Sequence, residues 1–197
     1  MLSALRPAIV STLLFTGLLG VAYPLGIAAA AKIIAPSQAE GSLVRDKSGH
    51  VIGSRLLAQA FTKPEYLHPR PSAAGKDGYD TTSTGGSNYG PLNSDLAKRM
   101  KDDADKIRKD DGAGLIPADA VTTSASGLDP DISPENARLQ ARRVALARGV
   151  DEAAVEQIIG EQTQGPALGF IGQPRVNVLE VNLTLDARYP MRAPAKP

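Results

Sequence analysis

The side chains that could act as acids, bases or nucleophiles are few in this chain. It has 197 residues, 2 histidines and no cysteine. His68, Asp80 and Ser87 supply the residue types of a hydrolase triad, in which histidine takes the proton of the serine hydroxyl. Such a set occurs by chance in almost any domain, and the G-x-S-x-G turn that presents a nucleophile is missing. The sequence therefore gives little support to hydrolysis.

Two loops contain groups that could hold an ion. Gly85, Gly86, Ser87 and Asn88 form a glycine-rich turn whose backbone N–H groups could face an anion, but no Walker A loop accompanies it. Glycine-rich turns usually have only a structural role and bind no anion.

Asp129, Asp131, Ser133 and Glu135 alternate like the oxygen ligands of a calcium loop. Proline stands where that loop requires glycine, and Gln140 stands where it requires the last glutamate. We therefore expect an Asx turn that leads into a capped helix, with no metal site.

Composition excludes further classes of site. Without cysteine the chain has no disulfide, no thiolate metal ligand and no cysteine nucleophile. Two of its 22 basic residues flank the apolar N-terminal segment, so the remainder has 20 against 21 acidic residues. A nucleic-acid-binding domain should have a basic face, so we expect no nucleic acid partner. Tryptophan is absent and only 4% of residues are aromatic, which leaves little for stacking on sugars or bases.

The elements that would position these loops are short. A β-hairpin is expected around Asp46 to Gly49, followed by a long loop rich in Gly, Pro and Ser at residues 62–93. A charged helix capped by Asn93 or Ser94 comes next, and then a short strand at residues 120–123.

Two more helices and a strand complete the expected fold. Ser133 caps one helix, Gly149 ends it, and Asp151 caps the next. Residues 176–186 alternate apolar and polar side chains, which predicts a half-buried strand. The expectation is one small α+β domain over residues 35–190, followed by a loose tail at residues 191–197.

The N-terminal segment has a different chemistry. Residues 7–31 contain no charged side chain, and Arg6 and Lys32 flank them. As a helix this segment would be roughly 37 Å long, against about 30 Å for a bilayer core. We therefore expect residues 1–34 to be a flank and a transmembrane helix. A cleaved signal peptide is the alternative, but its apolar core would be only about 7–15 residues long.

Small residues recur every four positions in this segment, and such spacing lets two helices approach closely. We expect partner-helix packing on two such rows, which consist of Thr12, Thr16 and Gly20 and of Ala22, Gly26 and Ala30. The other interpretation is that small residues are simply common in spanning helices. The short first flank, with Arg6, slightly favours a cytoplasmic N-terminus and an extracytoplasmic domain.

Short motifs along nearly the whole chain resemble the KdpC family, whose members belong to the Kdp potassium-transporting P-type ATPases. Their order and spacing are more specific than any one of them. They are Leu5-Arg6-Pro7-Ala8, Tyr23-Pro24, Gly53-Ser54, Arg70-Pro71-Ser72, Tyr79-Asp80, Gly85-Gly86-Ser87-Asn88, Gly90-Pro91, Val121-Thr122, Ser124-Ala-Ser-Gly-Leu-Asp129-Pro130, Gln140, Arg143-Val144-Ala145, Gly172-Gln173-Pro174, Asn182-Leu183 and Leu185-Asp186.

The resemblance implies a non-catalytic subunit of a bacterial inner-membrane complex that imports K⁺ with high affinity. Its partners would be a channel-like K⁺-translocating subunit, a P-type subunit that hydrolyses ATP, a small single-span subunit and membrane lipid. The resemblance also implies a catalytic chaperone that raises the ATP affinity of the pump subunit. No tightly bound cofactor is implied, because ATP would act through the pump subunit and K⁺ is the transported ion.

Topology decides how such an effect on ATP could arise. If the domain lies outside the cytoplasm, it can stabilise the assembly or cover the K⁺ entrance, and its influence on ATP must pass through the spanning helix. With the opposite topology, Gln140 and the turn of Gly85, Gly86, Ser87 and Asn88 are the nucleotide-binding candidates. A membrane-anchored envelope enzyme or ligand-binding protein that works alone is the alternative function.

Overall fold

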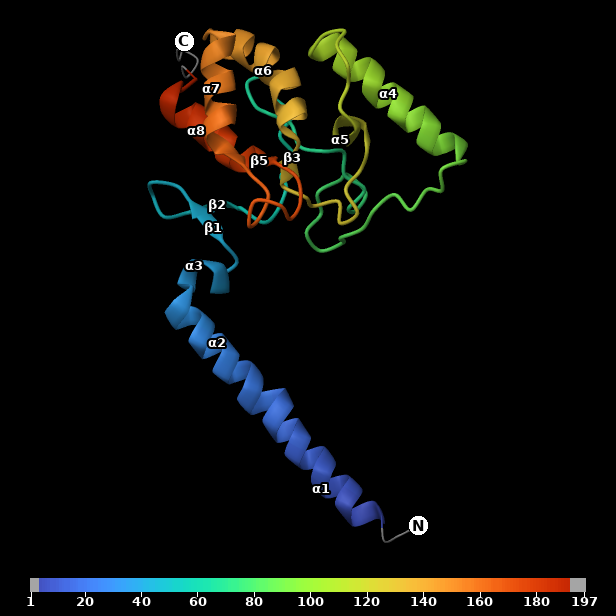
Figure 1. Ribbon diagram of the computed structural model, residues 1–197, viewed down its shortest axis with the longest axis vertical. Coiled ribbons are helices and arrows are strands. Elements are labelled where there is room, and N and C mark those ends of the chain that lie inside the picture. Colours follow the sequence, from blue (N-terminus) through green and yellow to red (C-terminus); the bar gives the residue numbers. More distant parts are fainter. Residues whose placement is uncertain (1–3, 192–197) are drawn as a thin grey trace, which may run out of the picture. The chain divides into compact units, whose positions relative to one another are not determined.

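The computed structural model describes residues 4–191, and the chain divides into two compact units between Ser54 and Arg55. Figure 1 shows the first unit in blue, with a long helix, and the second from cyan-green to red. The boundary predicted after residue 34 coincides with the end of the long helix. The two compact units divide later, after Ser54, so the hairpin that follows the helix belongs to the same unit as the helix. Of the predicted tail at residues 191–197, all but Met191 lies outside the described residues.

The long helix of the first unit is continuous but not uniform. It consists of α1 (Leu5–Phe15), the π-helical η2 (Thr16–Ala22) and α2 (Tyr23–Ile34). Together these 30 residues are long and apolar enough to cross a membrane, and none of their side chains is buried.

Pro24 explains the π-helical turns. Proline has no N–H, and its ring would clash with the carbonyl four residues earlier, at Gly20, in a regular α-helix. The wider turn carries the Tyr23 N–H to the carbonyl of Leu18, five residues back. The helix therefore continues past Pro24 without a break.

A one-turn helix, α3 (Pro36–Ala39), leads to the predicted hairpin, which is confirmed. Strands β1 (Leu43–Arg45) and β2 (Val51–Ser54) pair antiparallel, with Val44 opposite Gly53. The Asp46 carboxylate accepts the backbone N–H groups of Ser48 and His50 at 2.8 and 2.9 Å, which holds the turn.

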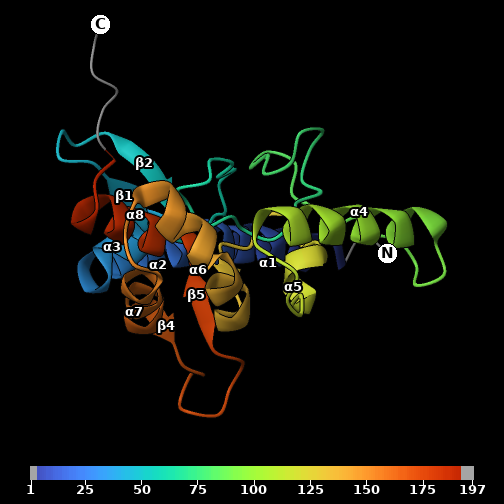
Figure 2. The ribbon, with the colours of Figure 1, turned by 90° about the horizontal axis from the view of Figure 1, so that it is seen from above.

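The second unit is helix-rich and contains one small antiparallel sheet. Its strands are β3 (Asp131–Ile132), β4 (Thr163–Gln164) and β5 (Arg175–Asn177), in the order β3-β5-β4. Three helices, α6 (Pro134–Arg148), α7 (Glu152–Gln162) and α8 (Val178–Arg188), pack together beside it (Figure 2). The core consists of Leu67, Ile132, Ala137, Ala141, Val144, Ala145, Val155, Ile158, Ile159, Val176, Val178, Val181 and Leu185.

Helix α6 begins and ends as predicted, whereas α7 begins after Asp151 as predicted but without the expected cap from the Asp151 side chain. The Ser133 hydroxyl accepts the Asn136 N–H at 3.1 Å, and Gly149 ends α6 in the left-handed conformation with φ of 67°. Asp151 precedes α7, but its backbone carbonyl, not its side chain, accepts the Ala154 N–H.

The strand predicted at residues 176–186 is wrong for most of its length. Only Arg175–Asn177 is a strand, and Val178–Arg188 is the helix α8. The same residues also place Val178, Val181 and Leu185 at helical spacing, and all three are buried. The Asn177 side chain accepts the Glu180 N–H at 3.1 Å, and this cap decides between the two periods.

The remaining elements lie at one end of the second unit. Helix α4 (Ser94–Asp110) is capped as predicted, because the Asn93 carboxamide accepts the Asp95 N–H at 2.7 Å. The strand predicted at residues 120–123 is wrong, since α5 (Ala118–Val121) is a single helical turn. The long loop at residues 62–93 is confirmed, for no helix or strand interrupts it.

Candidate functional site

The long loop is held in place by polar side chains on the inner face of α6. Gln140 is buried, and its Oε1 accepts the His68 N–H at 2.7 Å. Its Nε2 donates to the His68 carbonyl at 3.1 Å and to Asn136 Oδ1 at 3.0 Å. The side chain thus pairs with the backbone of the loop as a neighbouring strand would.

Arg143 extends the same contact one turn further along α6. Its guanidinium donates to the carbonyls of Pro64 and Tyr66 at 2.8 and 2.9 Å, and to Gln140 Oε1 at 2.7 Å. It also forms an ion pair with Asp111 at 2.7 Å, and both side chains are only 8% exposed. A buried pair with all these hydrogen bonds in place fastens both the loop and the end of α4 to α6.

Two further side chains complete this attachment. Asn182 on α8 accepts the Leu67 N–H at 2.8 Å and donates to the Leu67 carbonyl at 3.0 Å. Arg148 donates to the Glu65 carbonyl at 2.7 Å, and its guanidinium lies 5.1 Å from the centre of the Tyr66 ring. The sequence assigned neither residue this structural role, although each is a polar residue within an apolar helix face.

A cavity of about 250 Å³ lies where the loop, α4 and α6 meet. Burial and the nearby Arg143 lower the pKa of His68 below its usual value. Burial, with a smaller contribution from Asp103, raises the pKa of Tyr79 to about 12, so this phenol stays protonated. The lining residues include Phe61, His68, Tyr79, Asp103, Lys106, Ile107, Asp111, Asn136, Leu139 and Gln140.

The glycine-rich turn does not line this cavity. The Gly85 N–H donates to the Ser126 carbonyl at 2.9 Å. A Cβ on Gly86 would lie 3.1 Å from the Ala125 carbonyl oxygen, and Ser87 Oγ lies 3.4 Å from Thr123 Oγ1. The turn is therefore packed against the loop before β3, and it lies at a different place from Gln140.

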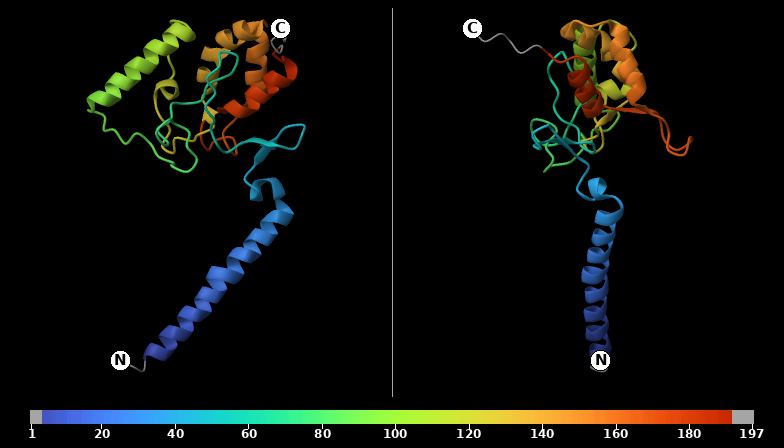
Figure 3. Two further views of the ribbon diagram at one scale, coloured as in Figure 1. Left: turned by 180° about the vertical axis from the view of Figure 1, so that it is seen from behind. Right: turned by 90° about the vertical axis from the view of Figure 1, so that its left-hand side faces the viewer.

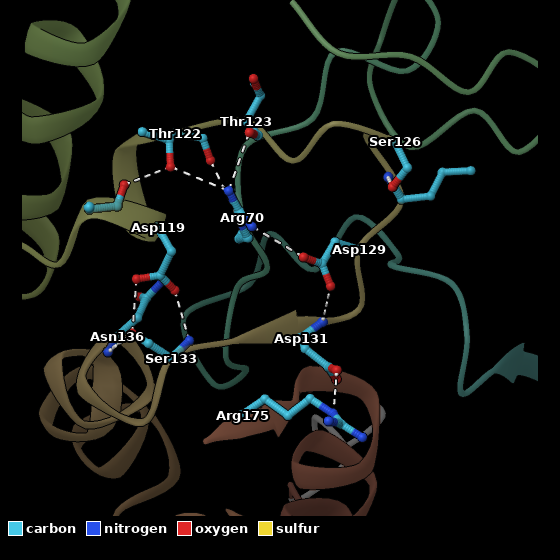
Figure 4. A network of polar contacts seen from close by, with 12 residues as sticks. Arg70, Asp119, Thr122, Thr123, Ser126, Asp129, Asp131, Ser133, Asn136 and Arg175 are labelled. Atoms are coloured by element: carbon cyan, nitrogen blue, oxygen red, sulfur yellow. Dashed lines mark hydrogen bonds and ion pairs between the residues drawn. The ribbon is translucent and has the colours of Figure 1, made fainter. Parts of the chain in front are cut away.

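Arg70 joins the long loop to the same segment before β3. Its guanidinium donates to the Thr123 carbonyl at 3.3 Å and forms an ion pair with Asp129 at 3.2 Å (Figure 4). The other Asp129 oxygen accepts the Asp131 N–H at 3.1 Å, so the predicted Asx turn is confirmed. Asp131 in turn pairs with Arg175 on β5 at 3.0 Å.

A second carboxylate in Figure 4 supports the start of α6. Asp119 on α5 accepts the Ser133 N–H at 2.8 Å, the Ser133 hydroxyl at 2.9 Å and the Asn136 side-chain amide at 3.0 Å. Of the calcium-like motif, Asp129, Asp131 and Ser133 therefore use their oxygens on neighbouring backbone, amide and guanidinium groups. Among residues 4–191, no group of three or more potential metal-ligating side chains comes together.

The three residues of the triad hypothesis bond to different groups. His68 Nε2 lies 3.0 Å from the Lys63 carbonyl oxygen. Asp80 accepts the backbone N–H and hydroxyl of Thr82, which lower the pKa of Asp80, and Ser87 lies against Thr123. These contacts provide no nucleophile–base pair.

The small residues of the long helix are exposed. A Cβ on Gly20 would meet only the Thr16 methyl group, at 3.8 Å, and one on Gly26 would meet nothing within 4 Å. A step of four residues rotates by slightly more than one full turn in an α-helix and by slightly less than one full turn in a π-helix, so the two deviations offset each other. Thr12, Thr16 and Gly20 therefore stay in one row across the junction of α1 and η2.

Comparison with known proteins matches the chain over nearly its full length. The family model KdpC, described as "K+-transporting ATPase, c chain", matches residues 5–187. A protein from Caulobacter sp. (strain K31), named "Potassium-transporting ATPase KdpC subunit", is 65% identical over 96% of both chains. Proteins with the same name from Beijerinckia indica and Koribacter versatilis are 56% and 46% identical, over 100% and 95% of this chain and 100% and 96% of theirs.

Proposed function

Because the chain belongs to the KdpC family of K⁺-transporting ATPases, we propose that it is a non-catalytic accessory subunit of a high-affinity ATP-driven K⁺ import complex. The observation that carries this proposal is the match over residues 5–187, which includes both units. The contacts of the candidate site support it, because the polar side chains of α6 are bonded within the domain. Its partners are a channel-like subunit, a P-type ATPase subunit and a small single-span subunit.

The chain stabilises the assembly and raises the ATP affinity of the pump subunit. Its long helix spans the bacterial inner membrane, with the N-terminus in the cytoplasm and the second unit outside. The length, apolar character and exposed side chains of Leu5–Ile34 support the span, and Arg6 supports the orientation. In this topology the spanning helix carries the influence on ATP, as a coupling between distant sites.

Within the membrane, the rows of small residues pack against a partner helix. Thr12, Thr16 and Gly20 form one row, and Ala22 and Gly26 belong to the other. The open space around Gly20 and Gly26 supports this role, because nothing in the described part of the chain covers them.

Direct contact with nucleotide would require the opposite topology. Gln140 and the turn of Gly85, Gly86, Ser87 and Asn88 would then be the candidates. Gln140 lines the cavity, but its oxygen and nitrogen already bond to His68, Asn136 and Arg143, and the turn lies elsewhere. These contacts favour an effect on ATP through the pump subunit. A topology reporter fused after Pro197 tests the extracytoplasmic placement of the second unit. Activity of a reporter that works only in the cytoplasm would overturn that placement.

Membership of the complex is tested by mild solubilisation of a tagged chain from potassium-starved cells. The proposal expects two large membrane subunits to be purified with it in constant ratio. A chain that returns as a monomer, from cells that express the pump, would contradict the proposal.

A further inference from the structure

The loop between β4 and β5 presents large apolar side chains to solvent. Leu168 is 83% exposed, Phe170 is 77% exposed and Ile171 is 53% exposed. No charged residue occurs between Glu161 and Arg175, although 22% of the chain is charged. Figures 2 and 3 show this loop projecting beyond the neighbouring helices of the second unit, so the domain itself does not cover it. Exposed apolar patches of this kind are typical of interaction sites.

The tip has a defined conformation. The Ala167 N–H donates to the Ile171 carbonyl at 2.8 Å, and the Ile171 N–H donates to the Ala167 carbonyl at 2.9 Å. Leu168 and Gly169 both have positive φ, 54° and 83°, as in a type I′ turn. The turn therefore presents its side chains in one arrangement, which reduces the entropy lost on binding.

Leucine is an unfavourable residue for the backbone conformation at position 168 of this turn. The left-handed conformation costs an L-residue other than Gly about 1–2 kcal/mol, and Asn or Asp tolerates it best. A leucine that is both strained and exposed gains nothing within the described part of the chain. Strained residues of this kind gather at binding sites, where the side chain is needed in one direction.

We propose that Leu168 and Phe170 insert into an apolar pocket on a partner subunit of the K⁺-transporting ATPase. This inference rests on the proposed function, which supplies the partner subunits. The turn is far smaller than the roughly 20–30 residues a side of a stable interface, so it cannot hold a second copy alone. It fits a partner to which the chain is already tethered by its spanning helix, because the tether raises the effective concentration.

A lipid surface is a poorer occupant. Loops and helices that bind anionic membranes place Lys or Arg beside their apolar residues. The nearest cation along the chain is Arg175, which pairs with Asp131 at 3.0 Å and donates to Gln164 at 3.0 Å. This nearest cation is thus engaged by a carboxylate and an amide of the domain, and the apolar tip suits a neutral protein pocket.

The test is a double variant, Leu168→Asn with Phe170→Asn, in the tagged full-length chain. Asparagine suits positive φ, so the turn should form and the unfolding midpoint of the chain should stay the same or rise. Leu92→Asn with Leu115→Asn is the matched control, because these leucines are 99% and 98% exposed outside helices and strands. The expected result is an at least tenfold loss of co-purified ATPase subunits in the first variant only.

Crosslinking and the other co-purification results also test the inference. A photoreactive benzophenone side chain at position 170 should crosslink to an ATPase subunit in native membranes, whereas crosslinks to lipid or to a second copy would overturn the inference. Normal co-purification by the loop variant, or an equal loss in the control, would also overturn it and leave the proposed function standing. A wild-type chain that captures no ATPase subunit would remove the proposed function, and the inference with it.

Discussion

The inner face of α6 and the helix Leu5–Ile34 use their side chains in opposite ways. On α6, Asn136, Gln140 and Arg143 are buried and bonded to the long loop or to one another. On Leu5–Ile34, no side chain is buried. The polar side chains of this face of α6 are thus engaged inside the domain, whereas the largely apolar side chains of Leu5–Ile34 are left uncovered. This difference is what we expect of a subunit that acts through contacts with partners.

The largest expected effect comes from breaking the α6 attachment. Arg143→Ala removes one member of a buried ion pair and leaves Asp111 and two loop carbonyls without their donor. We expect a loss of about 3–5 kcal/mol in the free energy of unfolding. Urea unfolding of the full chain in detergent, followed by the near-ultraviolet circular dichroism of tyrosine, measures it.

Arg108→Ala is the matched control on the exposed helix α4. Its ion pair with Asp105 is solvent-exposed on both sides, so the expected change is within about 0.5 kcal/mol. Equal losses in the two variants would show that the α6 contacts have no special weight.

The next effect tests how tightly the loops pack on one another. Gly127 has φ of 70°, and an added Cβ would lie 2.7 Å from the backbone atoms Ala74 N and Gly85 O. We expect Gly127→Ala to cost about 2–3 kcal/mol by the same unfolding measurement, through both strain and clash.

Substitutions at two other glycines distinguish backbone strain from steric clash as causes of that loss. Gly149 has φ of 67° but open space, so Gly149→Ala should cost about 1–2 kcal/mol through strain alone. Gly165 has neither constraint, and Gly165→Ala should change stability by only a few tenths of a kcal/mol. A loss at Gly127 no larger than at Gly149 would mean that the loops are not closely packed.

A smaller effect concerns pH. Burial lowers the pKa of His68 in the folded chain, so the unfolded chain, with a histidine pKa of about 6.5, takes up the proton more readily. The contribution of neutral His68 to the free energy of unfolding is fully present above about pH 6.5. It is lost as the pH falls from there through the pKa of His68 in the folded chain. His68→Gln should flatten the dependence of the unfolding free energy between about pH 7 and 5. A profile unchanged by His68→Gln, or changed equally by His50→Gln, would contradict this account.

The smallest effect on folding is expected in the membrane helix. Gly20→Leu meets only the Thr16 methyl group, so the unfolding of the domain should not change. Co-purification of partner subunits should fall, because the added side chain blocks a close helix contact. Gly17 also has open space but lies outside the row, so Gly17→Leu is the control. Normal assembly and activity with Gly20→Leu would count against packing on this row.

Local signals made part of the fold predictable. The caps at Asn93 and Ser133, the left-handed Gly149 and the turn at Asp46 each act over a few residues, so the sequence displays them. The helix at Val178–Arg188 was missed because its apolar residues fit both periods, and only the Asn177 cap distinguishes them.

The candidate site was less predictable, for a different reason. Gln140 bonds to His68, which is 72 residues earlier, and Asn182 bonds to Leu67, which is 115 residues earlier. Nothing local in the sequence indicates such pairs. The available signal is a polar residue within an apolar helix face, as at Arg143 between Ala141 and Val144. That signal shows that a partner must exist, but it does not name the partner.

The most direct test of the central claim is the ATP dependence of hydrolysis by the purified complex, with and without this chain, at a fixed K⁺ concentration. If the chain acts on the pump subunit through contacts, its removal should raise the ATP concentration required for the half-maximal rate, and adding the full chain back should restore it. The same ATP dependence and the same K⁺-stimulated rate in both preparations would contradict that claim.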